Sequence, residues 1–230
     1  MNKIEGGKLL VLRTLALTGV IAAIFYISHV IGGRMVWRDY NPLIQPISDL
    51  TAVSAISQPM ATKILWGYNI FNLLFCGVLL VFFKRFFPIN KIFYSALILK
   101  TLAELLSTFG YKFFPLADTA WSNSFQNTMH YAITAVIVLS YIVLSILLAL
   151  GLSKAKTYPK MTVFLKIFSI IFIASGFFTV LAAQVLPSYV GLIERVNLYS
   201  LMVLNVVLAF WMGSLVSPLA LEVLWIFKCG

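Results

Sequence analysis

Charged residues are scarce in this sequence, and acidic residues are the scarcest. Only 10% of the 230 residues are charged, with seven Asp and Glu against 17 Lys and Arg, while 61% are hydrophobic. A soluble globular domain carries about 25% charged residues. The chain therefore has too little polar surface to cover one water-soluble core, and a lipid bilayer is the solvent that suits so much apolar surface.

Cysteine and histidine are also scarce, with two residues of each. Cys76 lies within a hydrophobic stretch and Cys229 is next to last, so we expect no disulfide framework. Two histidines cannot build a three-histidine zinc site, and the sequence has no His-x-x-x-His pair and no glycine-rich phosphate loop. The sequence therefore predicts no cofactor.

Six hydrophobic stretches are long enough to cross a membrane. About 20 mostly apolar residues span the roughly 30 Å hydrocarbon core as a helix, and backbone groups in lipid must bond within their own segment. We therefore predict an all-α integral membrane bundle of six transmembrane helices, forming a single domain over residues 1–230. The expected spans are about Leu10–Ile31, Ile64–Phe83, Ile92–Tyr111, Tyr131–Leu152, Phe164–Leu186 and Asn197–Val216.

Lys and Arg are distributed unevenly between the two sides of this bundle. One side holds eleven, the other five, and Lys100 lies within a span, which accounts for the 17. Because cytoplasmic loops carry the excess of Lys and Arg, we expect both termini in the cytoplasm. A nucleic-acid binder would gather these residues on a polar face, so no nucleic-acid partner is expected. The eleven are Lys3, Lys8, Arg13, Lys84, Arg85, Lys91, Lys154, Lys156, Lys160, Lys166 and Lys228; the five are Arg34, Arg38, Lys63, Lys112 and Arg195.

The first expected outer connection, from Gly32 to Lys63, is long for a helix bundle. After Pro46 the sequence has the pattern of a helix start, with Ser48 or Asp49 as the N-cap. We expect a short helix there, lying on the outer interface or folded over the mouth of the bundle. The tail after Pro218 is expected either to extend the sixth helix or to lie on the inner surface.

Several segments, in their order and spacing, resemble a known family. The most specific is the stretch from Tyr40 to Leu50, and it is followed by Gly67 to Asn72, Phe114-Pro115, His130 and Gly191 to Arg195. Over nearly its whole length the chain resembles the bacterial membrane family catalogued as domain of unknown function 998. The resemblance implies a multi-pass protein of the bacterial plasma membrane without an assigned activity. That family often has Gly where this chain has Thr51, so we expect the local turn to differ.

Polar residues in or beside the spans form the candidate site. Lys100 and Glu104 are four residues apart on the third helix and share a face. Ionisable residues at membrane depth usually face the bundle interior and find a partner, so we expect a neutralised structural pair, a proton or ion site, or a Lys100 that snorkels to the interface. The expected topology places most of the candidates at outer-leaflet depth, around an outward-facing cavity. They are His29, Asp49, Asn69, Asn72, Lys100, Glu104, His130, Glu194 and Arg195.

Three functions remain open. The first is binding or transport of a small molecule or lipid head group at the outward-facing cavity, with membrane lipids around the bundle. The second is an intramembrane metal-dependent hydrolase, because His29, His130 and a carboxylate such as Asp49 are a donor set that can hold zinc. The third is a structural or regulatory subunit in which the polar groups serve helix packing. Serine catalysis by Ser48 with Asp49 and His130 is a weaker reading than helix capping.

Reporter fusions test the predicted topology. A reporter that is active only in the cytoplasm should be active when it is fused within the 84–91 or the 154–160 connection, because both carry the excess of basic residues. The same reporter fused within the expected outer connection from Gly32 to Lys63 should be inactive. The opposite pattern of activities would contradict the orientation.

Overall fold

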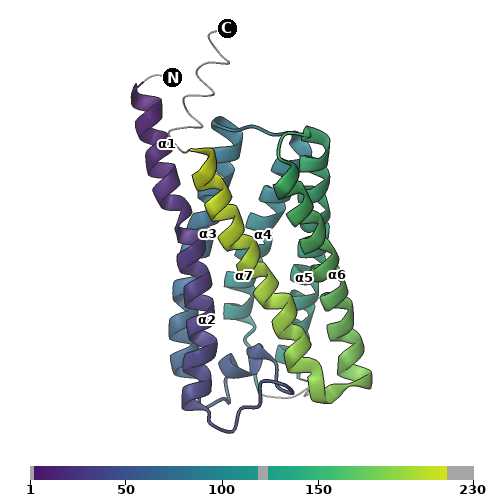
Figure 1. The fold of residues 1–230 in the computed structure, drawn as a ribbon. Coiled ribbons are helices and arrows are strands. Elements are labelled where there is room, and N and C mark those ends of the chain that lie inside the picture. Colours follow the sequence, from purple (N-terminus) through teal and green to yellow (C-terminus); the bar gives the residue numbers. More distant parts are fainter. Residues whose placement is uncertain (1–2, 119–123, 217–230) are drawn as a thin grey trace.

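The computed structural model describes residues 3–118 and 124–216, and all regular elements within them are helical (Figure 1). Six helical segments are long and apolar enough to cross a membrane, so the predicted all-α membrane bundle is confirmed. The long helices are α1 (Lys3–Ala16), α2 (Thr18–Val36), α3 (Gln58–Arg85), α4 (Lys91–Phe113), α5 (Phe125–Ala155), α6 (Pro159–Val185) and α7 (Val190–Leu215). Two short 3-10 helices are η1 (Ile47–Thr51) and η2 (Pro187–Tyr189).

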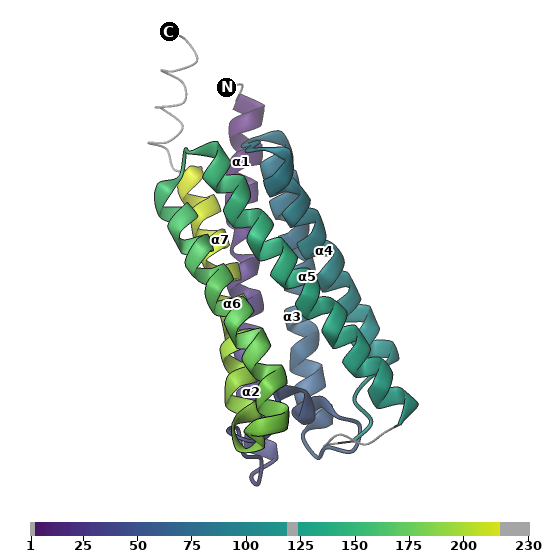
Figure 2. The ribbon, with the colours of Figure 1, turned by 90° about the vertical axis from the view of Figure 1, so that its right-hand side faces the viewer.

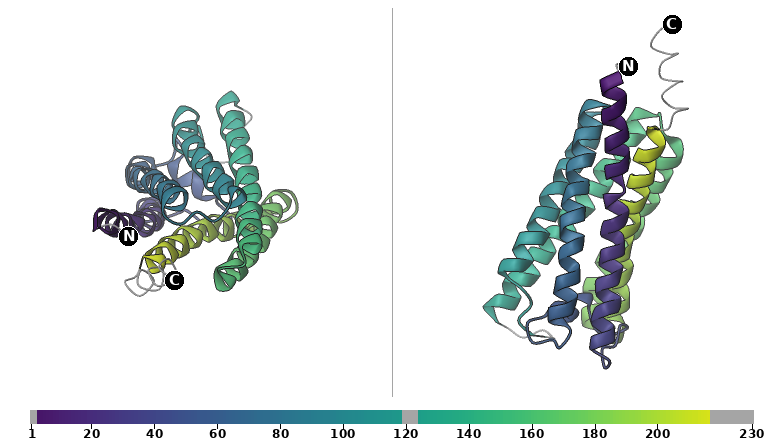
Figure 3. Two further views of the ribbon diagram at one scale, coloured as in Figure 1. Left: turned by 90° about the horizontal axis from the view of Figure 1, so that it is seen from above. Right: turned by 90° about the vertical axis from the view of Figure 1, so that its left-hand side faces the viewer.

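The first span consists of α1 and α2, which follow one another as a single long column (Figure 3). The interruption lies at Leu17, whose N–H donates to the Thr14 carbonyl, three residues back, rather than to the carbonyl four back. The Thr18 hydroxyl donates to the Leu15 carbonyl at 2.6 Å. Such local bonds tighten or bend a helix without ending it, so the column still crosses the membrane as one span.

The spans close into a ring. Each helix from α2 to α7 packs against the next in the chain, and α7 packs back against α2. The most extensive pairs are α4 with α5 and α2 with α3. Figure 2 shows α5 leaning away from α6 towards the lower end of the view, where it stays beside α4. The ring gives every span an inner face, and polar side chains from different helices meet there.

The packing of α4 on α5 depends on a close contact at Gly151. A Cβ atom at this position would lie only 2.8 Å from the backbone nitrogen of Phe93. The Asn90 side chain accepts from the Phe93 N–H at 3.0 Å, which caps α4, and its amide donates to the Gly151 carbonyl at 2.7 Å. One asparagine therefore both starts α4 and fixes it against α5.

The two ends of the bundle differ in character (Figure 1). The start of α1, the α3–α4 and α5–α6 turns and the end of α7 lie at one end, called the basic end here because its exposed residues include Lys8, Lys84, Arg85, Lys154 and Lys160. The 37–57 connection and the α6–α7 turn lie at the opposite end, called the loop end. The basic end is the one predicted to face the cytoplasm.

Several helix boundaries differ from the expected spans. α5 begins at Phe125 and α7 at Val190, so His130 lies inside its helix and the Glu194–Arg195 pair lies within α7 rather than before it. The extra turn of α5 is polar and is capped by the Ser124 side chain, which accepts from the Asn127 N–H at 3.1 Å. A search for apolar runs misses such turns because their stability comes from capping rather than from lipid contact.

The expected short helix after Pro46 is present as η1, but the expected N-cap is wrong. Pro46 holds the N-cap position, and Ser48 and Asp49 lie inside the helix. The Pro46 carbonyl accepts from the Asp49 N–H at 3.2 Å, and the Thr51 hydroxyl donates to the Ser48 carbonyl at 3.0 Å. The tail after Pro218, which includes Cys229, lies outside the described residues. The first two residues of the chain also lie outside them.

Two glycines of α7 provide a matched test of the packing at the loop end. A Cβ at Gly191 would lie 2.8 Å from the Pro42 carbonyl oxygen and would also collide with the Gln45 carbonyl, whereas one at Gly213 meets no atom within 4 Å. We expect Gly191→Ala to destabilise the fold by about 1–3 kcal/mol. Gly213→Ala should stabilise it by roughly 0.5–1 kcal/mol. Thermal unfolding midpoints of the two variants in detergent measure these effects. Equal effects of the two substitutions would contradict the close packing of the 37–57 connection against Gly191.

Candidate functional site

The polar centre of the bundle is built on Lys100 and Glu104 of α4. The Lys100 Nζ lies 3.4 Å from the Glu104 Oε1, and the two residues are 1% and 3% exposed. Their spacing of one helical turn puts both side chains on the face of α4 that points into the ring. Lys100 is therefore buried in an ion pair and does not snorkel to the interface.

Side chains from the neighbouring helices complete the surroundings of this pair. The Tyr68 hydroxyl of α3 donates to the Glu104 Oε2 at 3.2 Å, and the Tyr141 hydroxyl of α5 donates to its Oε1. The Lys100 Nζ contacts the Cys76 Sγ at 3.7 Å and lies 5.9 Å from the centre of the Tyr141 ring. The two phenols thereby join α3 and α5 to the carboxyl group of α4.

The network continues from α3 to α7. The Asn72 side-chain amide donates to the Tyr68 hydroxyl at 2.9 Å, and the Asn205 amide donates to the Asn72 Oδ1 at 3.0 Å. Both asparagines are buried. Because each bond polarises the next, α7 is coupled to the carboxylate of α4 through α3. Asn69, the other candidate on α3, is half-buried and takes part in none of these bonds.

At the loop end, Arg195 of α7 holds the connection that follows α2. Its Nη1 donates to the carbonyls of Pro42 at 2.6 Å, Gln45 at 3.0 Å and Gly191 at 2.7 Å. Its Nη2 donates to the Tyr40 hydroxyl, which in turn donates to the Gln45 carbonyl at 3.0 Å. A planar guanidinium with several donors suits this convergence of carbonyl oxygens.

Glu194 binds the same connection, but as a hydrogen-bond acceptor. Its Oε2 accepts from the Ile47 N–H, the first of η1, at 2.6 Å. Close by, the Leu192 N–H donates to the Leu43 carbonyl at 3.0 Å. Glu194 and Arg195 therefore satisfy donors and acceptors of the connection instead of pairing with each other. The contact formed by residues 40–47 with Glu194 and Arg195 is called the loop lock below.

Asp49 lies in η1, which directly follows the loop lock, whereas His130 lies in α5 and contacts the end of α4. Burial raises the pKa of Asp49 from its ordinary 3.8 to about 6, and the positive charge of Arg195 opposes this shift. The His130 Nδ1 lies 3.0 Å from the Phe114 carbonyl oxygen, and its ring stacks on Tyr111 with the ring centres 4.7 Å apart. His130 thereby fixes the end of α4 to the start of α5.

His29 of α2 is buried, and its Nδ1 has no hydrogen-bond partner in the described part of the chain. Its ring meets Tyr26 at 4.7 Å between centres, and Tyr26 meets Tyr68 at 5.1 Å. A line of rings thus leads from His29 to the polar centre. Among the residues that the structure describes, no three His, Cys, Asp or Glu side chains gather as metal ligands. This arrangement gives no support to a metal-dependent hydrolase that uses both histidines.

The predicted site residues thus fall into distinct hydrogen-bonded groups. Asn72, Lys100 and Glu104 meet at the polar centre, Glu194 and Arg195 meet at the loop lock, and His130 contacts the end of α4. The residues that sequence reasoning missed are Tyr26, Tyr40, Tyr68, Tyr141 and Asn205. Tyr68 had a usable signal, because it lies one helical turn before Asn72 on the same face.

The fold and its buried charged centre define an α-helical multi-pass membrane protein. The family model described as "Protein of unknown function (DUF998)" matches residues 20–211, so the chain belongs to this family. The match begins in α2 and ends in α7, so it includes both the polar centre and the loop lock. It confirms the resemblance carried by the Tyr40–Leu50 stretch. No curated protein and no solved structure matches the chain.

The raised pKa of Asp49 predicts a pH-dependent stability. Because its pKa in the folded protein lies above its unfolded value, the favourable contribution is complete below about pH 3.8 and is lost as the pH rises through about 6. We expect Asp49→Asn to be more stable than the wild type by up to about 3 kcal/mol at pH 7.5. The difference should shrink between pH 6 and pH 4.

Thermal unfolding midpoints from pH 4 to pH 8 measure this difference. Asp39→Asn, which removes the same charge from an exposed position of the same connection, is the matched control. A difference between Asp49→Asn and the wild type that does not change with pH would refute the role of Asp49 burial.

Proposed function

We propose that this protein binds or transports a small molecule or lipid head group, which reaches the polar centre through a cavity open at the loop end. The observation that carries the proposal is the buried Lys100–Glu104 pair. Glu104 lies about 14 Å from the loop-end terminus of α4, and Lys100 lies about as far from its other terminus. Ionisable residues at this depth mark substrate, ion or proton pathways.

The bonding of Lys100 supports a ligand with acceptor oxygens. An ammonium group has three donors, and here its acceptors are the Glu104 Oε1 at 3.4 Å and the Cys76 Sγ at 3.7 Å. Charge-assisted N–H···O bonds are normally about 2.7–2.9 Å long, and a thiol sulfur is a weak acceptor. A carboxylate or phosphate oxygen beside Lys100 would therefore improve on both contacts.

Tyrosines between the polar centre and the loop end support the direction of entry. Tyr26 packs against Tyr68 of the polar centre with the ring centres 5.1 Å apart. Nearer the loop end, the Tyr111 hydroxyl lies 2.9 Å from the Thr134 Oγ1. Glu194 and Tyr111 are each half-buried. Phenols along the proposed path of entry would offer hydroxyl groups to a polar ligand.

A structural or regulatory subunit is the second candidate. It is favoured by the loop lock, in which Glu194 and Arg195 are bonded to groups of the chain itself. Such a subunit would need the polar centre only for helix packing. For either function the location we propose is the plasma membrane, which the family resemblance implies.

Molecules that co-purify with the protein distinguish these functions. Wild-type protein should carry a compound, identified by mass spectrometry, that Glu104→Gln loses at least tenfold. Tyr141→Phe should lose it about as strongly, because a hydrogen bond to a charged group contributes roughly 1.5–3 kcal/mol. Tyr94→Phe is the matched control, since Tyr94 lies near Lys84 and takes no part in the polar centre.

An intact compound that depends on Glu104 and Tyr141 but not on Tyr94 is the expected result. If all the variants fold and no compound depends on Glu104, the binding function is wrong and the structural role stands. A compound recovered only as cleavage products would indicate catalysis.

A further inference from the structure

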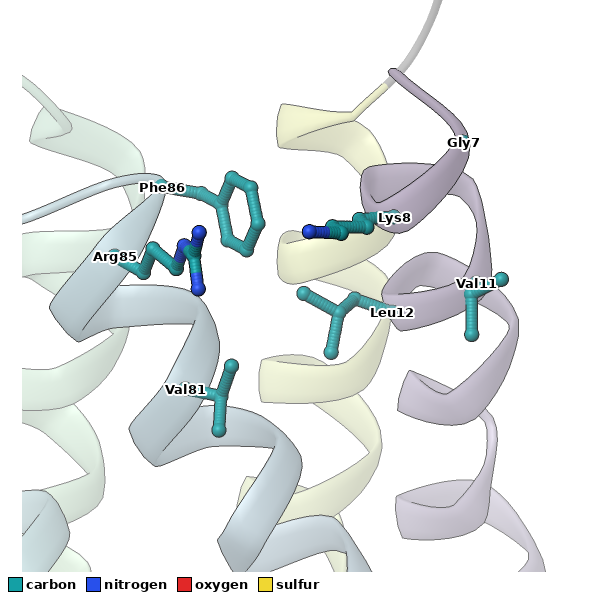
Figure 4. Close-up of a pocket in the computed structure, with 7 residues that line it drawn as sticks. All are labelled: Gly7, Lys8, Val11, Leu12, Val81, Arg85 and Phe86. Atoms are coloured by element: carbon teal, nitrogen blue, oxygen red, sulfur yellow. The ribbon is translucent and has the colours of Figure 1, made fainter. Parts of the chain in front are cut away.

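A hollow of about 500 Å³ opens at the basic end, between the first turns of α1 and the last turn of α3 (Figure 4). It lies at the opposite end of the bundle from the loop lock, and none of its residues belongs to the polar centre. The residues that line it are Gly7, Lys8, Val11, Leu12, Val81, Arg85 and Phe86.

Two cations converge on this hollow from different helices. Figure 4 shows the Lys8 ammonium and the Arg85 guanidinium pointing towards one another across the gap. Both residues are exposed, and neither forms an ion pair with a side chain that the structure describes. The Arg85 guanidinium lies 5.9 Å from the centre of the Phe86 ring. Two positive charges with no carboxylate partner among the side chains that the structure describes give this hollow a positive potential.

The apolar lining residues continue one helical turn deeper than the cations. Val11 and Leu12 follow Lys8 along α1, and Val81 precedes Arg85 by one turn of α3. Val11 and Val81 are exposed, so they face the surrounding lipid. The hollow therefore has a cationic rim at the level of the membrane interface and apolar walls towards the hydrocarbon. This is the order of groups along a phospholipid, with its phosphate at the interface and its acyl chains below.

A second hollow at the basic end repeats the combination. It measures about 260 Å³, lies between the end of α5 and the start of α6, and includes Lys156 and Lys166 with Leu152 and Val163. The pairing of two cations with apolar residues thus occurs on two sides of the same end. Each of the two hollows therefore combines two cationic side chains with apolar ones.

We propose that the hollow between α1 and α3 binds an anionic phospholipid. The phosphate and the acidic head group lie between Lys8 and Arg85, and an acyl chain packs along Val11, Leu12 and Val81. Arginine binds phosphate oxygens in a bidentate manner, and lysine adds a point charge. Basic pockets between helices at the cytoplasmic side of membrane proteins suit acidic head groups for the same reason.

Binding of phosphatidylglycerol to delipidated full-length protein in a zwitterionic detergent tests the site. Lys8→Gln combined with Arg85→Gln should weaken binding about 30-fold, equivalent to about 2 kcal/mol at 1.4 kcal/mol per tenfold change. The matched control combines Lys84→Gln with Lys91→Gln, which removes the same charge from exposed positions at the same end but outside the hollow. It should bind within about twofold of the wild type. Equal losses in both double variants would overturn the proposal, because the attraction would then be diffuse surface charge.

Further binding measurements identify which part of the lipid the protein recognises. Phosphatidylcholine, which has a phosphate but no net charge, should bind at least tenfold more weakly than phosphatidylglycerol. Inorganic phosphate in the millimolar range should not displace the lipid; displacement would show a free-anion site and overturn the lipid assignment. Leu12→Ala should weaken long-chain phosphatidylglycerol more than a short-chain form, whereas equal effects would contradict the acyl contact. Unchanged unfolding midpoints in lipid-free detergent would show that the exposed Lys and Arg substitutions leave the fold intact.

Discussion

A charge within the hydrocarbon layer of a membrane needs a partner, and Lys100 and Glu104 provide one for each other. The interior of the ring is arranged around this pair. Tyr68 and Tyr141 bring α3 and α5 to the carboxylate, and the bond between Asn72 and Asn205 extends the contact to α7. Lipid tails are as apolar as leucine, so apolar burial does not select which helices are neighbours. In this bundle, polar bonds of this kind and close contacts such as that of Gly151 with Phe93 determine which helices are neighbours.

In the loop lock, the polar groups that need partners belong to the backbone. The connection after α2 turns carbonyl oxygens and an N–H towards the start of α7, where the adjacent and oppositely charged Glu194 and Arg195 bind them. The loop end is therefore fixed by specific bonds, whereas the basic end has hollows lined by exposed lysine and arginine side chains. This difference separates the two proposed roles, with ligand entry at the loop end and an acidic lipid at the basic end.

Local sequence patterns predicted the parts of the structure that depend on neighbours along the chain. Long apolar runs gave the six spans, and the spacing of Lys100 and Glu104 gave their shared face. Tyr141 and Asn205 could not be assigned to the polar centre, because nothing local states which helix lies opposite α4. The proposed cap at Ser48 or Asp49 failed because Pro46 took that position. Lys8 and Arg85 were interpreted only as a topology signal, since their convergence depends on how α1 meets α3.

A double-mutant cycle on the buried pair tests the central claim most directly. The free energy of unfolding would be measured by denaturant titration for the wild type, Lys100→Met, Glu104→Gln and the double variant. Each single change leaves the other polar group without its partner and should cost roughly 3–5 kcal/mol. The double variant should lose far less than the sum of the two single losses, which is the signature of direct coupling. Losses that add fully would contradict the account, because the pair would then not be the contact around which the bundle is built.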